Sequence, residues 1–185
     1  MRFPAKVAAR AFVNKLERHE MVAEDVKVFI TNYKLDNPFE IVDILNTVKV
    51  SKIAIIAPEF SQSVLMSLVK TTQNGLFCYP IAVPSLRTAQ LEDIAVYTRA
   101  TLIDKDNNKT LHGVGTLDLG FAEKIVVKET ENKEDAILIG GKGEKLKTES
   151  MYSIAVHIEM LKGQIAEARN NLEKEQLKRR IANMS

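Results

Sequence analysis

Residues 37–75 read NPFEIVDILNTVKVSKIAIIAPEFSQSVLMSLVKTTQNG, and this stretch decides the fold. Two segments, 37–48 and 61–75, have apolar residues at helical spacing, and they enclose the short run KIAIIA at 52–57. A β-branched run without polar alternation is typical of a strand that a sheet buries on both faces. The stretch therefore predicts helix, buried strand and helix in succession.

The ends of both predicted helices are marked in the sequence. Asn37 followed by Pro38 is a favourable helix start, because the asparagine side chain accepts a backbone N–H and proline needs none there. Ser61 or Ser63 can cap the second helix, and Gly75 can end it in a left-handed turn.

Both helices carry more apolar surface than one buried face requires. At 100° per residue the apolar arc is roughly 160° wide on the first helix and roughly 200° on the second, against the little over 100° that a surface helix needs. The residues expected to face the sheet are Ile41, Ile44, Val48, Val64 and Leu68, and those left over are Val42, Leu45, Leu65, Met66 and Val69. The left-over residues can form an apolar groove between the helices. Burial under another chain segment or subunit is the alternative that periodicity leaves open.

The remainder of the chain alternates between strand and helix patterns. Residues 1–25 show no sustained period and are expected to be irregular or short-stranded. Further strands are predicted at 26–31, 76–83, 101–103, 124–128 and 136–139, with a helix at 87–98. From Met151 an amphipathic helix runs to Ala168, and a second, highly charged helix follows Asn170 and Asn171 as a helical hairpin. The fold class is therefore α/β, with a mixed sheet flanked by helices.

Composition limits the classes of partner and site. The 185 residues fit one domain, and 26 basic against 24 acidic residues give a net charge of +2, which favours neither nucleic acid nor an anionic membrane. A single cysteine, Cys78, excludes an internal disulfide and a multi-cysteine metal cluster. No segment approaches the ~18 apolar residues of a membrane helix, and no signal peptide is visible. We expect a cytoplasmic protein.

Patterns typical of catalysis are incomplete. The glycine run at 140–143 lacks the spacing of a phosphate-binding loop, and His19, His112 and His157 are far apart with no accompanying metal-ligand motif. Ser67 and its neighbours lack the glycine setting of a nucleophile elbow. We therefore assign no catalytic, metal-binding or cofactor-binding residue.

Several short motifs occur in an order that points to one family. They are Phe12 to Lys15 (FVNK), the segment 37–75, Leu91 to Ala95 (LEDIA), Asp118 to Gly120 (DLG) and the closing helical pair at 164–185. With these motifs in this order, the chain resembles the apical domain of group I chaperonins, the GroEL family.

The resemblance implies a fold, a function and partners. The fold is the chaperonin apical-domain (swivelling β/α/β) fold with a C-terminal helical hairpin, and residues 1–185 correspond to that one domain excised from a larger subunit. The function is capture of exposed apolar segments of non-native polypeptides between two helices, where a co-chaperonin lid also binds. Identical subunits would form a ring. ATP and Mg²⁺ would belong to an equatorial domain outside these residues, so the chain itself is not expected to be an enzyme.

The resemblance also assigns groove residues one by one. They fall on Val42 and Leu45 in the first helix, on Leu65 and Val69 in the second, and on Val7, Ala11 and Phe12 near the N-terminus; periodicity adds Met66. Val7 and Ala11 stand where the family commonly has tyrosine, and Lys70 stands at a usually apolar position. These changes reduce aromatic contact area and put a charge on the rim.

Other departures mark a divergent member of the family. The segment 82–90, AVPSLRTAQ, lacks the usual Gly-Phe-Gly-Asp-Arg-Arg signature, and Thr98, Arg99 and Ala100 replace Thr-Gly-Gly. A phage-encoded or duplicated bacterial chaperonin fits this pattern. Two alternatives remain: a swivelling domain of a metabolic enzyme, and a non-chaperone interaction module whose apolar groove one dedicated partner covers.

Overall fold

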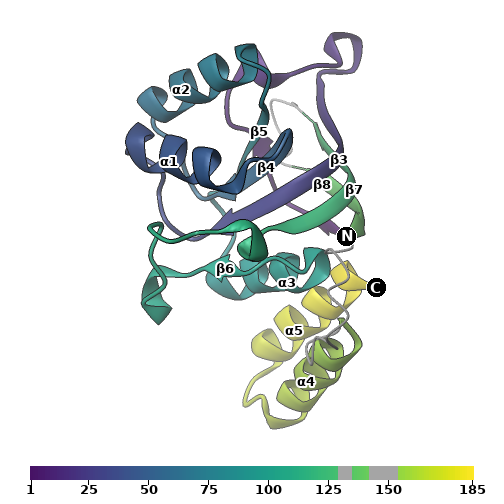
Figure 1. Cartoon of the computed structure of the whole chain (residues 1–185). Coiled ribbons are helices and arrows are strands. Elements are labelled where there is room, and N and C mark those ends of the chain that lie inside the picture. The colour runs from purple at the N-terminus through teal and green to yellow at the C-terminus, as the bar shows by residue number, and fades with distance from the viewer. Residues whose placement is uncertain (129–134, 142–153) are drawn as a thin grey trace.

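The computed structural model describes residues 1–128, 135–141 and 154–185. Within these ranges eight strands form one mixed sheet, with helices on both of its faces (Figure 1). The strands are β1 (Arg2–Phe3), β2 (Lys6–Val7), β3 (Glu20–Thr31), β4 (Lys52–Ala57), β5 (Phe77–Ala82), β6 (Leu102–Ile103), β7 (Gly120–Lys128) and β8 (Ala136–Gly141). The α-helices are α1 (Pro38–Val48), α2 (Gln62–Gln73), α3 (Thr88–Thr98), α4 (Ile154–Glu167) and α5 (Asn171–Met184). Short 3₁₀ turns are η1 (Arg10–Phe12), η2 (Leu16–Arg18), η3 (Lys105–Asn107) and η4 (Thr116–Asp118).

The centre of the sheet is parallel. β4 lies between β3 and β5, with Ile53 opposite Lys27 on one side and Cys78 on the other. Five of the six residues of β4 are buried, as its β-branched sequence predicts. α1 connects β3 to β4 and α2 connects β4 to β5, so both connections are strand–helix–strand units. The predicted helix–strand–helix order is confirmed.

The outer strands complete the order β1-β8-β7-β3-β4-β5-β2. β7 runs antiparallel to the first part of β3, and β6 pairs in parallel with Ile30 and Thr31 at its end. The edge strand β2 is only two residues long and pairs antiparallel with β5. A short edge strand offers little backbone for unwanted strand pairing.

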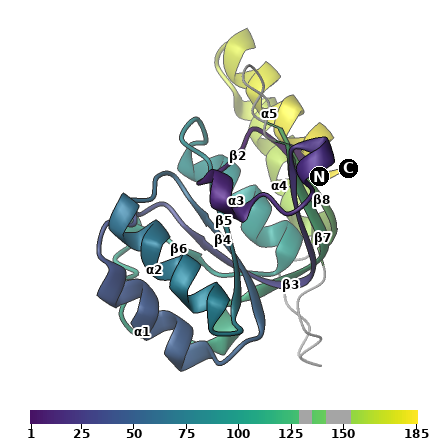
Figure 2. The same ribbon diagram turned by 90° about the horizontal axis from the view of Figure 1, so that it is seen from above.

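The helices form layers on the two faces of the sheet. α1 and α2 lie side by side over one face and α3 covers the other, as the two orthogonal views show (Figures 1 and 2). α4 and α5 pack against each other and join the molecule through α3 and β1. The helical pair has its own small apolar cluster, centred on Leu161 and Leu177, apart from the main core around the sheet. The predicted C-terminal hairpin is thus confirmed.

Two predicted strand starts are wrong. The strand expected at 26–31 begins at Glu20, and the one expected at 124–128 begins at Gly120. The added residues of each strand pair with the predicted part of the other strand, from Glu20 with Lys128 to Val28 with Gly120. Their partners lie about a hundred residues away, so no local pattern could reveal them. The predicted helix start at Met151 and residues 142–143 of the glycine run lie outside the described residues.

A buried ionic cluster connects α3 to both C-terminal helices. Asp93, which is 2% exposed, accepts hydrogen bonds from Arg180 Nε and Nη2, both at 2.7 Å. His157 Nε2 lies 2.8 Å from Asp93 Oδ1, and Arg180 Nη2 also donates to the Ala89 carbonyl at 3.2 Å. A bidentate arginine satisfies a buried carboxylate that would otherwise be strongly destabilising.

Replacing Asp93 should therefore destabilise the fold well beyond the effect of a surface charge. We expect Asp93→Ala to lower the free energy of unfolding by about 3–5 kcal/mol, because the partly buried Arg180 and the buried His157 would lose the carboxylate that they share. Urea denaturation measures this loss. Glu159→Gln is the control, since it breaks an exposed 2.7 Å pair with Lys162 and should cost less than about 1 kcal/mol. Equal losses in the two variants would contradict a structural role for the cluster.

The single thiol gives the fold a sensitivity to alkaline pH. Burial raises the pKa of Cys78 from 9.0 to about 12. The unfolded thiol therefore ionises above pH 9.0 while the folded one keeps its proton, so stability falls as the pH rises from 9.0 towards 12. Between pH 8 and 10.5 we expect the wild type to lose about 2 kcal/mol more than Cys78→Ala, at about 1.4 kcal/mol per pH unit. Chemical denaturation at the two pH values tests this, and identical losses would contradict the assignment.

Candidate functional site

α2 has one face on the sheet and a second apolar face that the sheet does not cover. Val64 and Leu68 are fully buried, whereas Leu65 and Val69 are half-buried and Met66 is 58% exposed. Ser61 starts the helix by accepting a hydrogen bond from Val64 N at 3.3 Å, and Gly75 adopts a left-handed φ of 101° beyond its end. Burial of Val64 and Leu68 against the core sets the rotation of the helix and hence the direction of its uncovered face.

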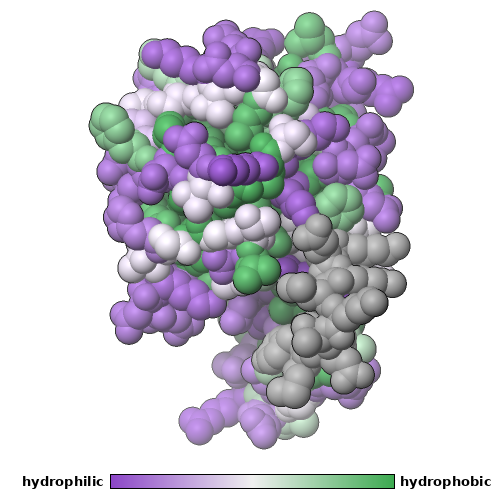
Figure 3. All heavy atoms as spheres, in the orientation of Figure 1, coloured by the Kyte–Doolittle hydropathy of each residue, from purple (hydrophilic) through white to green (hydrophobic). Residues whose placement is uncertain are grey.

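A hollow of about 670 Å³ lies along that face. Its lining is mainly apolar and consists of Ala9, Ala11, Phe60, Gln62, Leu65, Met66, Val69, Lys70 and Gln73. Residues of α2 form one wall, and residues of the N-terminal segment form the other. In the space-filling view apolar atoms gather over α1 and α2 between hydrophilic neighbours (Figure 3).

The N-terminal wall is held in place by the edge of the sheet. Lys6 and Val7 pair with Ala82 and Ile81 of β5, and Ala8 N donates to the Pro80 carbonyl at 3.1 Å. The chain then turns through η1, which buries Phe12 and leaves Ala11 exposed. This turn brings the small residues Ala9 and Ala11 opposite α2.

The structure brings five of the nine predicted groove residues to this hollow. They are Ala11, Leu65, Met66, Val69 and Lys70. Val7 is half-buried in β2, and Phe12 is 8% exposed and part of the main core. Neither of these two residues lines the hollow.

On α1 the structure separates the two predicted residues. Val42 is 37% exposed, but Leu45 is only 3% exposed and belongs to the main core. Ile41, Ile44, Leu45 and Val48 have the i, i+3, i+4, i+7 spacing of one buried stripe, so α1 buries a face of ordinary width. The sequence-based division that left Leu45 on an uncovered shoulder is therefore wrong. No residue of α1 lines the hollow, which lies between α2 and the N-terminal segment.

Four lining residues were missed from the sequence, and three of them have a recognisable signal. Phe60 precedes the helix cap and Leu65 is at the fourth helical position, which is the spacing of a hydrophobic staple. Gln62 and Gln73 continue the face of Met66 and Val69 by one turn in each direction. Ala9 has no such signal, because its place depends on the pairing of β2 with β5.

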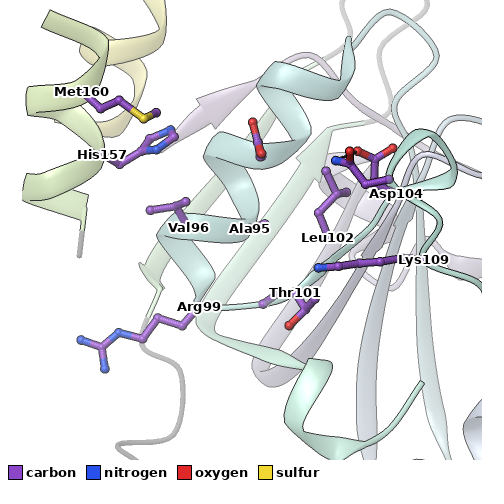
Figure 4. A pocket seen from close by; sticks show the side chains of 12 residues that line it. Ala95, Val96, Arg99, Thr101, Leu102, Asp104, Lys109, His157 and Met160 are labelled. Carbon is purple, nitrogen blue, oxygen red and sulfur yellow. Dashed lines mark hydrogen bonds between the residues drawn. The ribbon is translucent and has the colours of Figure 1, made fainter. Parts of the chain in front are cut away.

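A second hollow, of about 410 Å³, lies between α3, α4 and the loop after β6. His157 and Met160 reach into it from α4, whereas Arg99 points away from the others (Figure 4). Two of its polar side chains are bonded to neighbours, since Asp104 accepts hydrogen bonds from Asn32 Nδ2 at 2.6 Å and Asn107 Nδ2 at 2.7 Å. This network serves the packing of the loop.

Across the ranges that the structure describes, no group of three His, Cys, Asp or Glu side chains is placed to hold a metal ion. Among the described helices, none is both long and apolar enough to cross a membrane.

Comparison with known proteins finds relatives in sequence and matches in fold. No family model matches the chain. The chain is 29% identical over 191 residues to the chaperonin GroEL of Carsonella ruddii (strain PV), in an alignment that covers 100% of this chain and 34% of that protein. It thus spans about a third of the length of its relative.

Solved structures agree on the fold. The chaperonin gp146 from the bacteriophage EL 2 (Pseudomonas aeruginosa) superposes with a TM-score of 0.72 at 16% identity, covering 99% of this chain and 35% of that one. A second crystal form of the same chaperonin gives a TM-score of 0.71 at 15% identity, covering 98% and 36%. The resemblance to the GroEL family that the sequence motifs indicated is therefore confirmed: the chain is similar in sequence and in fold to about a third of a chaperonin subunit.

Proposed function

We propose that this chain is the polypeptide-binding (apical) domain of a chaperonin and that it captures exposed apolar segments of non-native proteins in the hollow beside α2. The observation that carries the proposal is the second apolar face of α2, where Leu65, Met66 and Val69 line a hollow instead of a core. Full-length similarity to a chaperonin segment supports it.

The physics of the hollow fits a promiscuous and weak binder. An apolar side chain that becomes fully buried gains about 1.5–3 kcal/mol, and this gain has no directional requirement. The lining offers two amides, one ammonium group and otherwise apolar atoms, so it imposes few hydrogen-bonding demands on a ligand. Extended and helical segments can both be accommodated.

Strong capture would come from several copies acting together. In the proposed parent protein, identical subunits form a ring and several hollows engage one substrate, which can raise avidity by about 10²–10⁴ without new contacts. ATP and Mg²⁺ would act in a separate domain of that subunit. A co-chaperonin lid would release the substrate by occupying the same hollow. We place this activity in the cytoplasm of a bacterium or of a phage-infected host.

The proposal predicts which substitutions abolish capture. Val69→Glu and Met66→Glu should each weaken suppression of aggregation of a chemically denatured protein by at least about tenfold, because a carboxylate in the hollow loses the apolar contact and requires hydration. Light scattering with the domain in excess measures suppression, and urea denaturation checks that the variants remain folded.

One further variant serves as a control for this test, and another is excluded from it. Leu172→Glu is the matched control, because Leu172 is 70% exposed on α5, away from the hollow. Leu45→Glu is unsuitable as a groove variant, since it would bury a charge in the core. Full activity in folded Val69→Glu and Met66→Glu would refute the site, and binding to one protein alone would favour a dedicated interaction module.

A further inference from the structure

The charge around the hollow has one sign. Lys70 is the one charged residue among the described residues that line the hollow, and its side chain is exposed on α2. On the opposite wall Arg10 stands between the lining residues Ala9 and Ala11 and is also exposed. Two cations thus face solvent from the two walls of an apolar hollow.

Neither cation is neutralised by the part of the chain that the structure describes. No hydrogen bond or ion pair of the Lys70 or Arg10 side chain occurs among the described residues. The acidic residue adjacent to lining Phe60 is Glu59, and Lys34 holds it at 2.6 Å. That contact lowers the pKa of Glu59 through a hydrogen bond and the charge of Lys34, so this carboxylate is already occupied.

The remaining polar groups in the hollow do not offset this charge. Gln62 and Gln73 carry neutral amides at the two ends of the α2 wall. With a purely apolar ligand, Lys70 and Arg10 would interact only with water. A ligand that carries a carboxylate would form ion pairs with them at the edge of the hollow.

We propose that the preferred occupant of the hollow is a polypeptide segment that combines apolar side chains with an aspartate or glutamate placed to meet Lys70 and Arg10. This inference rests on the proposed function, because it names the class of segment that the same site selects. Exposed ion pairs contribute modestly, so the selectivity is about two- to fivefold and falls as salt is added.

The test uses one amphipathic peptide in three versions. Each carries a fluorophore and the same apolar face, and a single position beside that face is Glu, Gln or Lys. Fluorescence anisotropy with the whole chain should rank the affinities Glu, then Gln, then Lys, with about threefold between neighbours at low salt. The ranking should collapse at 1 M salt, where the Debye length is about 3 Å.

Substitutions of Lys70 and Arg10 test whether these two side chains cause the preference for the Glu peptide. Lys70→Gln and Arg10→Gln should each lower the ratio of the affinity for the Glu peptide to the affinity for the Gln peptide, measured on the same variant. Arg179→Gln is the matched control, because Arg179 is exposed on α5 and its loss changes the net charge equally. If Arg179→Gln reduces the preference for the Glu peptide as much as Lys70→Gln does, the preference reflects the net charge of the chain, and the inference is overturned.

The outcomes separate this inference from the proposed function. If all three peptides bind equally and Val69→Glu abolishes binding, the hollow is a polypeptide site and the charge selectivity is refuted. If no version binds, or if Val69→Glu leaves binding unchanged, the proposed function itself fails.

Discussion

The structure depends on the burial of β4 on both faces in the middle of the sheet. Because β3 and β5 flank β4 in parallel, the chain must return over the sheet through α1 and α2, and both helices cover one face. α3 covers the other face. α2 leads into β5, and the sheet ends beside β5 with the two-residue strand β2. The outer side of α2 therefore faces the N-terminal segment instead of another helix. The hollow is a consequence of that position, since two alanines cannot fill the space beside Leu65, Met66 and Val69.

Local sequence predicted most of the central fold and little of its periphery. α1, β4 and α2 follow from caps, periodicity and a β-branched run, and their bounds match the prediction to within two residues. The first half of β3 escaped prediction because acidic Glu20, Glu24 and Asp25 weaken its strand pattern. Its backbone is satisfied by β7, about a hundred residues later in the chain. Pairing at such separation is a property of the whole chain and cannot be read from a local window.

The residues of the candidate site were likewise only partly predictable from local sequence. Helical geometry alone placed Leu65, Met66 and Val69 on the face that the structure leaves uncovered. The same geometry failed for Leu45, because a helical wheel gives the width of an apolar arc but not which flank a neighbour covers. Ala9 entered the site only through the pairing of β2 with β5. The family resemblance pointed to α2 and the N-terminal segment, which line the hollow, but also to α1, which does not.

Methyl NMR of the chain titrated with an apolar peptide tests the central claim most directly. The account predicts that the methyl signals of Leu65 and Val69 shift with the peptide concentration. The signals of Leu117 and Leu172, which are 80% and 70% exposed but outside the hollow, should not move. Shifts at Leu117 or Leu172 with none at Leu65 and Val69 would show that exposure alone governs binding, and would contradict the assignment of the hollow as the polypeptide site.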